Sequence, residues 1–539
     1  MSYQLVVSEK PSVGAAYAKV LGATNRQDGY WEGNGYLVSW CIGHLVSFAE
    51  AGQYDEKYCK WRYEDLPILP QPWQFIVPDE KKQQFEIVRS LLNRPDVDSV
   101  TAATDAGREG ELIFRFVYQM AGCTKPVKRL WISSMEDAAI QQGFENLKDG
   151  AEYDNLFAAS ECRAKADWLI GMNGTRAFTK KYGRKQTIGR VQTPTLAMLA
   201  ERQTKIQNFV KEPYYKVELS GAGVVAVSEQ MAQEQDADAM QAACDGQCAV
   251  VGSIERKRGE KKPPKLYDLT TLQREANRYY DLTASQTLQA AQELYEEKMV
   301  TYPRTDSQYV TEDMKETVEM LMNGMIEFLP FLKSGQIGGN PERVINNAKV
   351  SDHHAILPTK EALENGMEGL SDGKKNLMLL IGQQLVQATG EDYRCEQTEI
   401  TVQCKEHEFT AKGKRPVQMG FKEAEETFRK SCVKAKKEDE SESRNAIPEG
   451  YKEKMVLSGV KAEKSTHYTS PPKMFTEDTL LAAMETAGNK EFDSETEKKG
   501  LGTPATRASI IEKLVSSGYA KRKGKQILPT TEGCELIHV

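Results

Sequence analysis

The chain has 539 residues, a formal net charge of −7 and a mean hydropathy of −0.57. This length is too great for one hydrophobic core and indicates three or four domains, and no apolar run is long enough to cross a bilayer. The first ten residues lack the basic segment and the apolar run of a signal peptide, so we expect a cytoplasmic protein with no membrane contact.

Acidic residues follow two strand-like segments near the start of the chain. Gln4–Ser8 ends at Glu9, and residues 98–104 end at Asp105, with Glu109 four positions later. Each segment is followed by apolar residues at helical spacing, and in open α/β sheets ligands bind at the carboxyl ends of strands. The three carboxylates could therefore converge on magnesium, which prefers oxygen ligands. A solvated acidic loop is the alternative.

A long amphipathic helix is predicted over residues 154–179. Polar side chains on this helix and on the segment after it are donors that could hold phosphate groups. They are Arg163, Arg176, Arg190, Gln192 and Thr193. A plain connection between two helices is the alternative.

Residues 301–307 place a phenol and a guanidinium two positions apart, at Tyr302 and Arg304. The preceding segment has helical spacing, with Ser285 as its predicted N-cap, so Tyr302 sits at the end of a rigid element. A phenol has a pKa of about 10 and needs a nearby cation to attack phosphorus at neutral pH. We interpret Tyr302 as a covalent nucleophile; a half-buried tyrosine in a turn is the alternative.

Strand patterns over residues 214–254 return after Thr398, which indicates that the chain leaves a β-rich domain and comes back to it. Between them, His353 and His354 form the one adjacent histidine pair, and His353 could donate to a phosphate, although a surface pair is the commoner meaning. Near the end of the chain, the threonines of residues 502–507 could cap a helix, and Arg507 could point to an anion near the start of that helix.

Cofactor motifs are few. The ten cysteines have no second pair or histidine spaced for zinc, and no P-loop is present, so we expect neither zinc nor ATP. Residues 434–444 alternate charges of both signs and are predicted to be a solvated loop.

Six motifs, taken in order, resemble those of the type IA DNA topoisomerases, and more closely the bacterial topoisomerase III branch. No motif is decisive alone, whereas their joint order over nearly the whole chain is specific. They are Ser8-Glu9-Lys10-Pro11-Ser12, Thr104-Asp105-Ala106-Gly107-Arg108-Glu109-Gly110-Glu111, Gly189-Arg190-Val191-Gln192-Thr193-Pro194, Tyr302-Pro303-Arg304-Thr305-Asp306-Ser307, His353-His354-Ala355-Ile356 and Gly502-Thr503-Pro504-Ala505-Thr506-Arg507.

The resemblance implies a multidomain fold of the α/β plus α and β class, arranged as a toroid. An N-terminal Toprim α/β domain, a helical DNA-binding domain, a β-rich arch and a helical domain that carries the nucleophile are expected. Their boundaries are, respectively, 1–152; 153–212 with 470–539; 213–277 with 401–469; and 278–400.

The family pattern also implies roles. Tyr302 would form a 5′-phosphotyrosine, with Arg304 stabilising the phosphate, His353 donating a hydrogen bond to it, and Glu9 and Lys10 acting on the leaving group and the phosphate. Single-stranded DNA would be held by Arg163, Arg176, Arg190, Gln192, Thr193 and Arg507, and magnesium by Glu9, Asp105 and Glu109. The implied enzyme is a monomer that relaxes negative supercoils and unlinks DNA without ATP; a helicase or another DNA-processing partner is left open.

Two departures from the family pattern stand out. Gly107 occupies a position where many relatives have aspartate, so the metal site should have one acid fewer or recruit Glu111. The chain also stops at Val539, where relatives usually continue, so we expect either a truncated or a naturally short last domain.

Two other functions fit parts of the sequence. A Toprim nuclease or primase-like enzyme would use Glu9, Asp105 and Glu109 with magnesium, and Tyr302 would be structural. A single-stranded DNA binding protein without catalysis would use only the arginines and aromatic residues.

Overall fold

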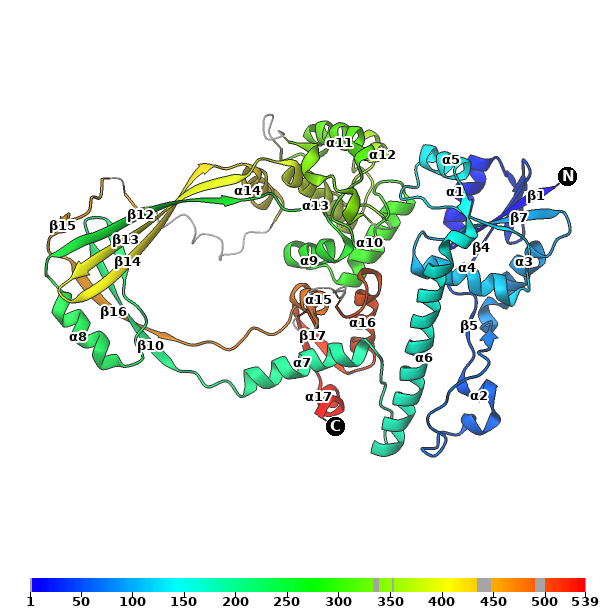
Figure 1. Ribbon diagram of the computed structural model, residues 1–539, viewed down its shortest axis with the longest axis horizontal. Coiled ribbons are helices and arrows are strands. Elements are labelled where there is room, and N and C mark those ends of the chain that lie inside the picture. Colours follow the sequence, from blue (N-terminus) through cyan, green and yellow to red (C-terminus); the bar gives the residue numbers. More distant parts are fainter. Residues whose placement is uncertain are drawn as a thin grey trace.

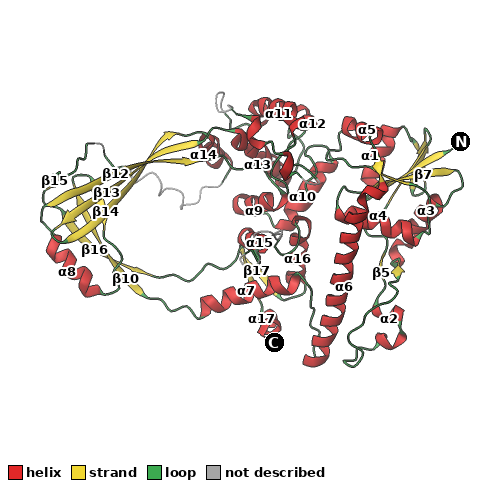
Figure 2. Cartoon of the chain, viewed as in Figure 1, coloured by secondary structure: helices red, strands yellow, loops and turns green. Residues whose placement is uncertain are grey.

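The computed structural model describes residues 2–332, 339–350, 353–433, 447–448, 450–489 and 500–538. The charged segment 434–444 lies outside them. The elements follow a ring, with a twisted sheet at one end, helical bodies in the middle and a second sheet at the far side (Figures 1 and 2). No helix in the described ranges is both long and apolar enough to span a membrane.

The N-terminal body is an α/β layer built on a seven-stranded sheet of order β2-β3-β4-β1-β7-β8-β9. The central strands β4, β1, β7 and β8 run parallel, and helices pack against the sheet. The strands are β1 (Tyr3–Ser8), β2 (Asn25–Gln27), β3 (Tyr30–Gly33), β4 (Tyr36–Trp40), β7 (Val97–Ala103), β8 (Val127–Arg129) and β9 (Lys148–Asp149). The helices are α1 (Pro11–Leu21), α3 (Lys82–Leu92), α4 (Arg108–Met120) and α5 (Asp137–Glu145).

The turn after β1 is short because α1 begins almost at once. Pro11 occupies the first position of α1, where its missing N–H costs nothing. Gly22 ends the helix with a φ of 76°, in the left-handed region that favours glycine. Glu9 and Lys10 are therefore fixed between a buried strand and a well-bounded helix.

A second short turn joins β7 to α4, and its geometry depends on Gly110. A Cβ atom at Gly110 would lie 2.0 Å from the carbonyl oxygen of Asp105, whereas one at Gly107 would have no neighbour within 4 Å. We expect Gly110→Ala to lower the free energy of unfolding by about 1–3 kcal/mol, because the backbone of Asp105 must move. Gly107→Ala is the matched control, since its extended backbone accepts alanine. Equal stability of the two variants in denaturant titrations would contradict this packing.

The second sheet has the order β15-β12-β13-β14-β11-β10-β16 and is assembled from three separate stretches of the chain. The sequence therefore predicted correctly that the chain leaves this sheet and returns, because β12 pairs with β13 across more than one hundred intervening residues. Its elements are β10 (Pro213–Gly221), β11 (Val224–Val227), α8 (Glu234–Cys244), β12 (Ala249–Lys261), β13 (Tyr393–Cys404), β14 (His407–Gln418), β15 (Val456–Leu457) and β16 (Lys461–Tyr468).

Two helical bodies lie between the sheets. One comprises α9 (Leu269–Tyr280), α10 (Ala284–Glu296), α11 (Lys315–Phe328), α12 (Lys360–Asn365), α13 (Asp372–Thr389) and α14 (Phe421–Cys432). The other comprises α6 (Asp154–Tyr182), α7 (Gln192–Gln207), α15 (Glu477–Thr486), α16 (Pro504–Ser516), β17 (Ala520–Lys523), β18 (Gln526–Pro529) and α17 (Thr531–His538).

The start of α10 differs from its prediction. Thr283, rather than Ser285, is the N-cap, because its hydroxyl accepts the backbone N–H of Gln286 at 3.1 Å while the Gln286 side chain returns a bond to the Thr283 amide. The two hydrogen bonds of this capping box stabilise a helix start at Thr283 more than a single hydrogen bond from Ser285 would stabilise one at Ser285.

Candidate active site

Glu9 and Asp105 meet at the carboxyl ends of two neighbouring parallel strands, β1 and β7. The backbone N–H of Asp105 donates to Glu9 Oε2 at 3.3 Å. Glu9 is only 4% exposed, and this burial, followed by the charge of Asp105, raises the pKa of its carboxyl to about 8. Burial raises the pKa of Asp105 as well, and its Oδ2 has no hydrogen-bond partner within the described part of the chain.

Glu109, in the first turn of α4, contacts His44 and Arg304 and makes no hydrogen bond to the other two acids within the described residues. His44 Nε2 lies 3.5 Å from Glu109 Oε1, and Arg304 Nη1 lies 3.3 Å from Oε2. The hydrogen bond from His44 is the main reason that the pKa of Glu109 is lowered. Among the described residues no three His, Cys, Asp or Glu side chains are grouped closely enough to hold a metal ion. Of the three acids predicted to bind magnesium, Glu9 and Asp105 thus form a close pair, whereas Glu109 is held by His44 and Arg304.

Tyr302 lies at the seam between the N-terminal sheet body and the helical body of α10. Its backbone N–H donates to the carbonyl oxygen of Ser133, across the seam, at 2.8 Å. Its ring is 6% exposed. It packs edge-on against Tyr295, with 5.4 Å between centroids, and at a tilt of 35° against His353, with 4.2 Å between centroids. Burial, and then the charge of Asp105, raises the pKa of the Tyr302 hydroxyl well above its usual 10. In this closed arrangement the phenol is protonated.

His353 is buried at the same seam, not exposed as in a surface pair. Its Nδ1 lies 2.7 Å from the hydroxyl of Ser133, and its Nε2 faces the carbonyl oxygen of Ala106. Burial lowers the pKa of the imidazole to about 4, so the ring is neutral at physiological pH. Because a carbonyl only accepts, Nε2 carries the proton and Ser133 donates to Nδ1. The donor predicted for a phosphate is therefore occupied by the Asp105–Ala106 turn.

Further contacts close the seam. Lys10 Nζ lies 2.7 Å from Glu296 Oε1, and the hydroxyl of Ser12 donates to Glu296 Oε2 at 3.0 Å. Lys298 pairs with Asp137 on α5. Glu296 lies at the end of α10 and Lys298 just after it. The helix that leads to Tyr302 is therefore bound to the N-terminal sheet body by these contacts.

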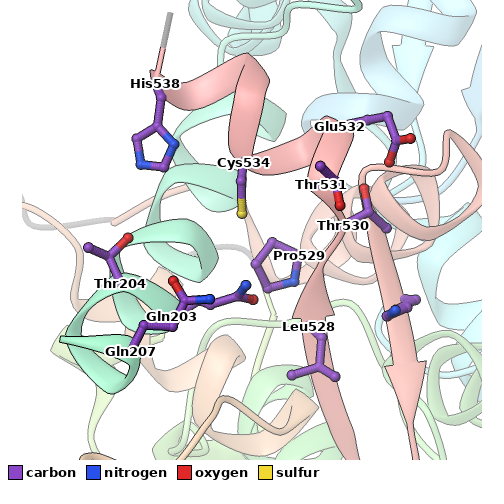
Figure 3. A pocket seen from close by; sticks show the side chains of 11 residues that line it. Gln203, Thr204, Gln207, Leu528, Pro529, Thr530, Thr531, Glu532, Cys534 and His538 are labelled. Carbon is purple, nitrogen blue, oxygen red and sulfur yellow. The ribbon is translucent and has the colours of Figure 1, made fainter. Parts of the chain in front are cut away.

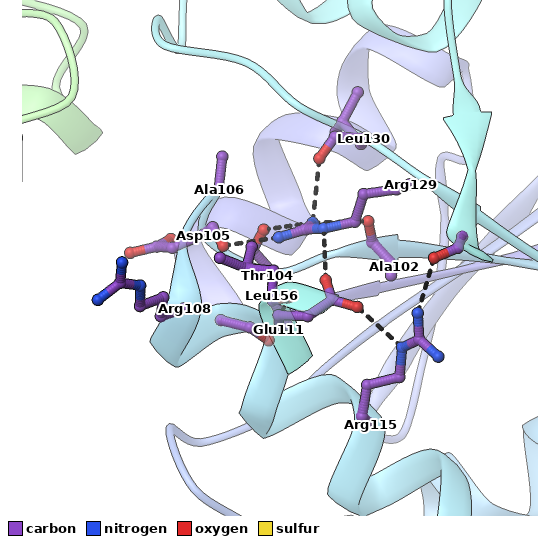
Figure 4. A network of polar contacts seen from close by, with 12 residues as sticks. Ala102, Thr104, Asp105, Ala106, Arg108, Glu111, Arg115, Arg129, Leu130 and Leu156 are labelled. Carbon is purple, nitrogen blue, oxygen red and sulfur yellow. Dashed lines mark hydrogen bonds and ion pairs between the residues drawn. The ribbon is translucent and has the colours of Figure 1, made fainter. Parts of the chain in front are cut away.

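A buried ion pair that the sequence did not reveal supports the acidic turn (Figure 4). Arg129, at the end of β8, is 1% exposed, and its Nε lies 3.0 Å from Glu111 Oε2. Arg115 binds the other oxygen of Glu111 at 2.8 Å. The guanidinium of Arg129 also donates to four backbone carbonyls, those of Ala102, Thr104, Asp105 and Leu130.

This pair overturns the expectation that Glu111 could join the metal site. Both oxygens of Glu111 are paired with arginines, and the side chain is buried. Arg129 also lies 5.2 Å from the ring of Trp131, which stacks on His353 at 5.9 Å. One cation thus positions the carbonyls around Asp105 and, through Trp131, the histidine beside Tyr302.

Positive charge gathers beside these acids. The pKa of Arg163 is lowered by burial and then by the charges of Arg108 and Arg190, which places three guanidinium groups near one another and near Glu109. Arg190 is held by Asp167, with Nε 2.8 Å from Oδ1. Arg108 is exposed in the first turn of α4. The sequence did not predict it as a DNA contact, because nothing in its position in the motif distinguishes it from an ordinary solvated arginine.

The other predicted DNA contacts divide into two groups. Gln192 is buried in the first turn of α7, and neither polar atom of its side chain has a hydrogen-bond partner in the described ranges. Thr193 accepts the N–H of Gly189 at 3.0 Å, which shapes the turn before α7. Both lie close to Arg190 in the chain, at the start of α7.

Arg176 and Arg507 differ from their predictions. Arg176 is buried, donates to the carbonyl oxygen of Tyr58 at 2.8 Å and lies 5.2 Å from the ring of Trp61. Arg507 is 2% exposed and donates to Thr270 Oγ1 at 2.8 Å and to backbone carbonyls. Each guanidinium joins two segments of this protein, so its fork is used for internal contacts where a phosphate contact was expected.

A separate cavity of about 610 Å³ lies between α7, β18 and α17 (Figure 3). Gln203, Pro529, Cys534 and His538 are among the residues that line it. None of the catalytic or metal candidates contributes to this lining, so the seam, and not this cavity, is the candidate active site.

The ring of domains and the seam define a class of enzyme, the type IA DNA topoisomerases. The DNA topoisomerase family model matches residues 151–539, and the Toprim domain model matches residues 4–135. The full-length topoisomerase I of Thermotoga maritima has a similar fold, with a TM-score of 0.74 at 21% identity over 99% of this chain and 82% of that one.

Sequence relatives narrow the class. DNA topoisomerase 3 of Shouchella clausii is 40% identical over all of this chain and 75% of its own length, and that of Bacillus subtilis is 38% identical over all of this chain and 76% of its own. The chain therefore belongs to the DNA topoisomerase family, in its topoisomerase III branch. The nuclease or primase-like alternative and the non-catalytic binding protein are not favoured.

Proposed function

We propose that this chain cleaves one DNA strand with Tyr302, holds the broken end as a 5′-phosphotyrosine, lets a strand pass and rejoins the break. The supporting observation is the seam, where a tyrosine on the helical body lies within the electrostatic reach of Glu9 and Asp105 on the sheet body. Exchange of a phosphodiester for a phosphotyrosine conserves the bond energy, so the cycle needs no ATP. We also propose that the protein acts as a monomer and that this reaction relaxes negative supercoils and unlinks DNA circles.

The side chains at the seam divide the work. Arg304 retains its charge and has an Nε without a hydrogen-bond partner in the described ranges, so it can bind the phosphate under attack. Glu9, with a pKa of about 8, is protonated at neutral pH and can give its proton to the leaving 3′ oxygen. Lys10 and His353 must exchange their present partners, Glu296 and the Ala106 carbonyl, to reach the phosphate.

Magnesium fits Asp105, and Glu9 would join it once its carboxyl has given up the proton. Magnesium takes one or two carboxylates and keeps several waters, and Asp105 offers a buried oxygen with no partner in the described ranges. Glu109 would join only after it leaves Arg304 and His44. A magnesium ion here would neutralise phosphate charge during rejoining; Toprim domains generally bind this ion.

Gly107 gives a direct test of that site. Its Cβ position is open, so we expect Gly107→Asp to add a third carboxylate without strain and to bind magnesium about tenfold more tightly. The readout is the rise in melting temperature with magnesium concentration, which depends on affinity through mass action and not on turnover. Gly107→Asn is the control of equal size. An unchanged magnesium response in Gly107→Asp would place the ion elsewhere.

Single-stranded DNA is the proposed substrate, held by Arg163, Arg190, Gln192, Thr193 and the newly identified Arg108. Three guanidinium groups beside the acids supply the counter-charge that a phosphate backbone needs. We also propose domain boundaries at 1–152 and at 153–212 with 470–539. The boundaries expected after residues 277 and 400 fall inside α9 and β13, so we assign all of α9 to the helical body and all of β13 to the second sheet.

The decisive experiment traps the intermediate. Wild-type protein is mixed with single-stranded DNA labelled on the 3′ side of the cut and then denatured, and the label is expected on the protein. A magnesium-dependent nuclease would release both fragments, and a binding protein would leave the strand intact. Either outcome would refute the proposal.

A further inference from the structure

The lower end of α6 carries a basic and aromatic surface far from the seam. Trp61, Arg62, Tyr63, Glu64, Lys180 and Lys181 line a hollow of about 500 Å³ there. Tyr63 is 60% exposed, and large aromatic rings are usually more buried than this. We call this the α6-end surface.

Its charge is concentrated and uncompensated. Lys60, Arg62, Lys180, Lys181 and Lys185 are exposed and have no ion pair in the part of the chain that the structure describes. Glu64 is the one acid that lines the hollow. Arg62, Lys180 and Lys181 line the hollow, and Lys60 and Lys185 are near them in the sequence. In a chain with a net charge of −7, this local excess of positive charge favours a polyanionic ligand.

The surface is rigidly built. The segment that carries Trp61 and Tyr63 runs beside α6 to its carboxyl end (Figure 1). Asn173 on α6 exchanges two hydrogen bonds with the backbone of Ile68, at 2.6 and 3.0 Å. Arg176 bonds the Tyr58 carbonyl and lies against one face of Trp61. These contacts hold the segment and the ring of Trp61 in place before any ligand arrives, which lowers the entropy lost on binding.

The helix links this surface to the seam. Lys181 comes eighteen residues after Arg163, which is five full turns, so both side chains leave the same face of α6 about 27 Å apart. A strand whose phosphates meet Arg163 beside Glu109 can therefore extend toward Lys181 along one element.

We propose that the α6-end surface is a second contact for single-stranded DNA, which binds the strand beyond the cleavage site. Its lysines neutralise phosphates, and Tyr63 offers a face on which a base stacks. This inference rests on the proposed function for the identity of the ligand, but the contact itself does not require cleavage.

Binding of labelled single strands to Tyr302→Phe protein, followed by fluorescence anisotropy, tests the contact without cutting. Lys180→Ala with Lys181→Ala should lower the slope of log affinity against log salt by about 1.4, because two phosphate contacts are lost. Tyr63→Ala should weaken binding about tenfold, and Tyr63→Phe should retain it. Lys262→Ala with Lys452→Ala, two exposed lysines of the second sheet body, is the control of equal charge.

Strand length separates this contact from damage to the seam. The losses should occur with strands of about 16 nucleotides on one side of the site and vanish with strands of about 4. Equal losses with both lengths, no loss with either, or the same dependence for duplex DNA would overturn the proposal. If wild-type protein forms no covalent adduct but the length-dependent losses persist, the proposed cleavage fails and the contact stands.

Discussion

The Tyr302→Phe protein is expected to form no covalent adduct with DNA and to relax supercoiled plasmid at a rate lowered by about 10⁴-fold or more, because the attacking oxygen is gone. The packing should survive. The ring keeps its contacts with Tyr295 and His353, and the backbone N–H to Ser133 is untouched, so the free energy of unfolding should change by less than about 1 kcal/mol. Gel assays of the labelled adduct and of plasmid topology measure the two activities.

Tyr295→Phe is the matched control for this variant. Tyr295 is a buried tyrosine on α10 whose ring touches that of Tyr302, and burial raises the pKa of its hydroxyl as well. It should form the adduct at a rate close to that of wild type. If Tyr302→Phe still forms the adduct and Tyr295→Phe does not, the nucleophile has been assigned to the wrong residue.

Under the roles proposed for Tyr302 and His353, the closed seam has to open before the reaction. Tyr302 is buried with a raised pKa, and the Nε2–H of His353 donates to the carbonyl oxygen of Ala106. Entry of a phosphate near Arg304 would supply a new acceptor for these groups and would compete with Glu109 for the guanidinium. Substrate binding and release of the seam contacts are therefore linked, since the same side chains serve both.

Local sequence signals located the acids well because their geometry follows from the strand order. Glu9 and Asp105 follow strands that turned out to be parallel neighbours, so their meeting needed only that the two strands pair. The position of Glu109 depended on side-chain partners from distant segments, His44 and Arg304, and no spacing in the sequence indicates those.

Arginine is the residue whose role was hardest to predict. A guanidinium fork fits phosphate, carboxylate and backbone carbonyls equally well, so Arg176 and Arg507 gave the same signal as Arg163 and Arg190. Burial separates them, and burial is decided by tertiary packing. Arg129 was missed for the same reason, because a strand that ends in Val-Lys-Arg gives no sign that its last side chain is enclosed.

The buried pair of Glu111 and Arg129 gives the largest expected effect on stability. Glu111→Gln keeps the size of the side chain but leaves Arg129 enclosed without its counter-charge, so we expect the free energy of unfolding to fall by about 3–5 kcal/mol. The four carbonyl bonds of Arg129 reduce the loss but do not supply a negative charge. Urea titrations of the whole chain, followed by tryptophan fluorescence, measure the change, because all six tryptophans lie within residues 31–168.

A surface pair of similar chemistry provides the control. Glu86 and Arg89 are three residues apart on α3 and both are more than half exposed, so Glu86→Gln should cost less than about 1 kcal/mol. Activity gives a second readout, because Arg129 also fixes the carbonyl of Asp105 and the ring of Trp131 against His353. Under conditions where Glu111→Gln remains folded, its adduct should form more slowly at every magnesium concentration. A variant as stable and as active as Glu86→Gln would show that the pair does not support the acidic turn.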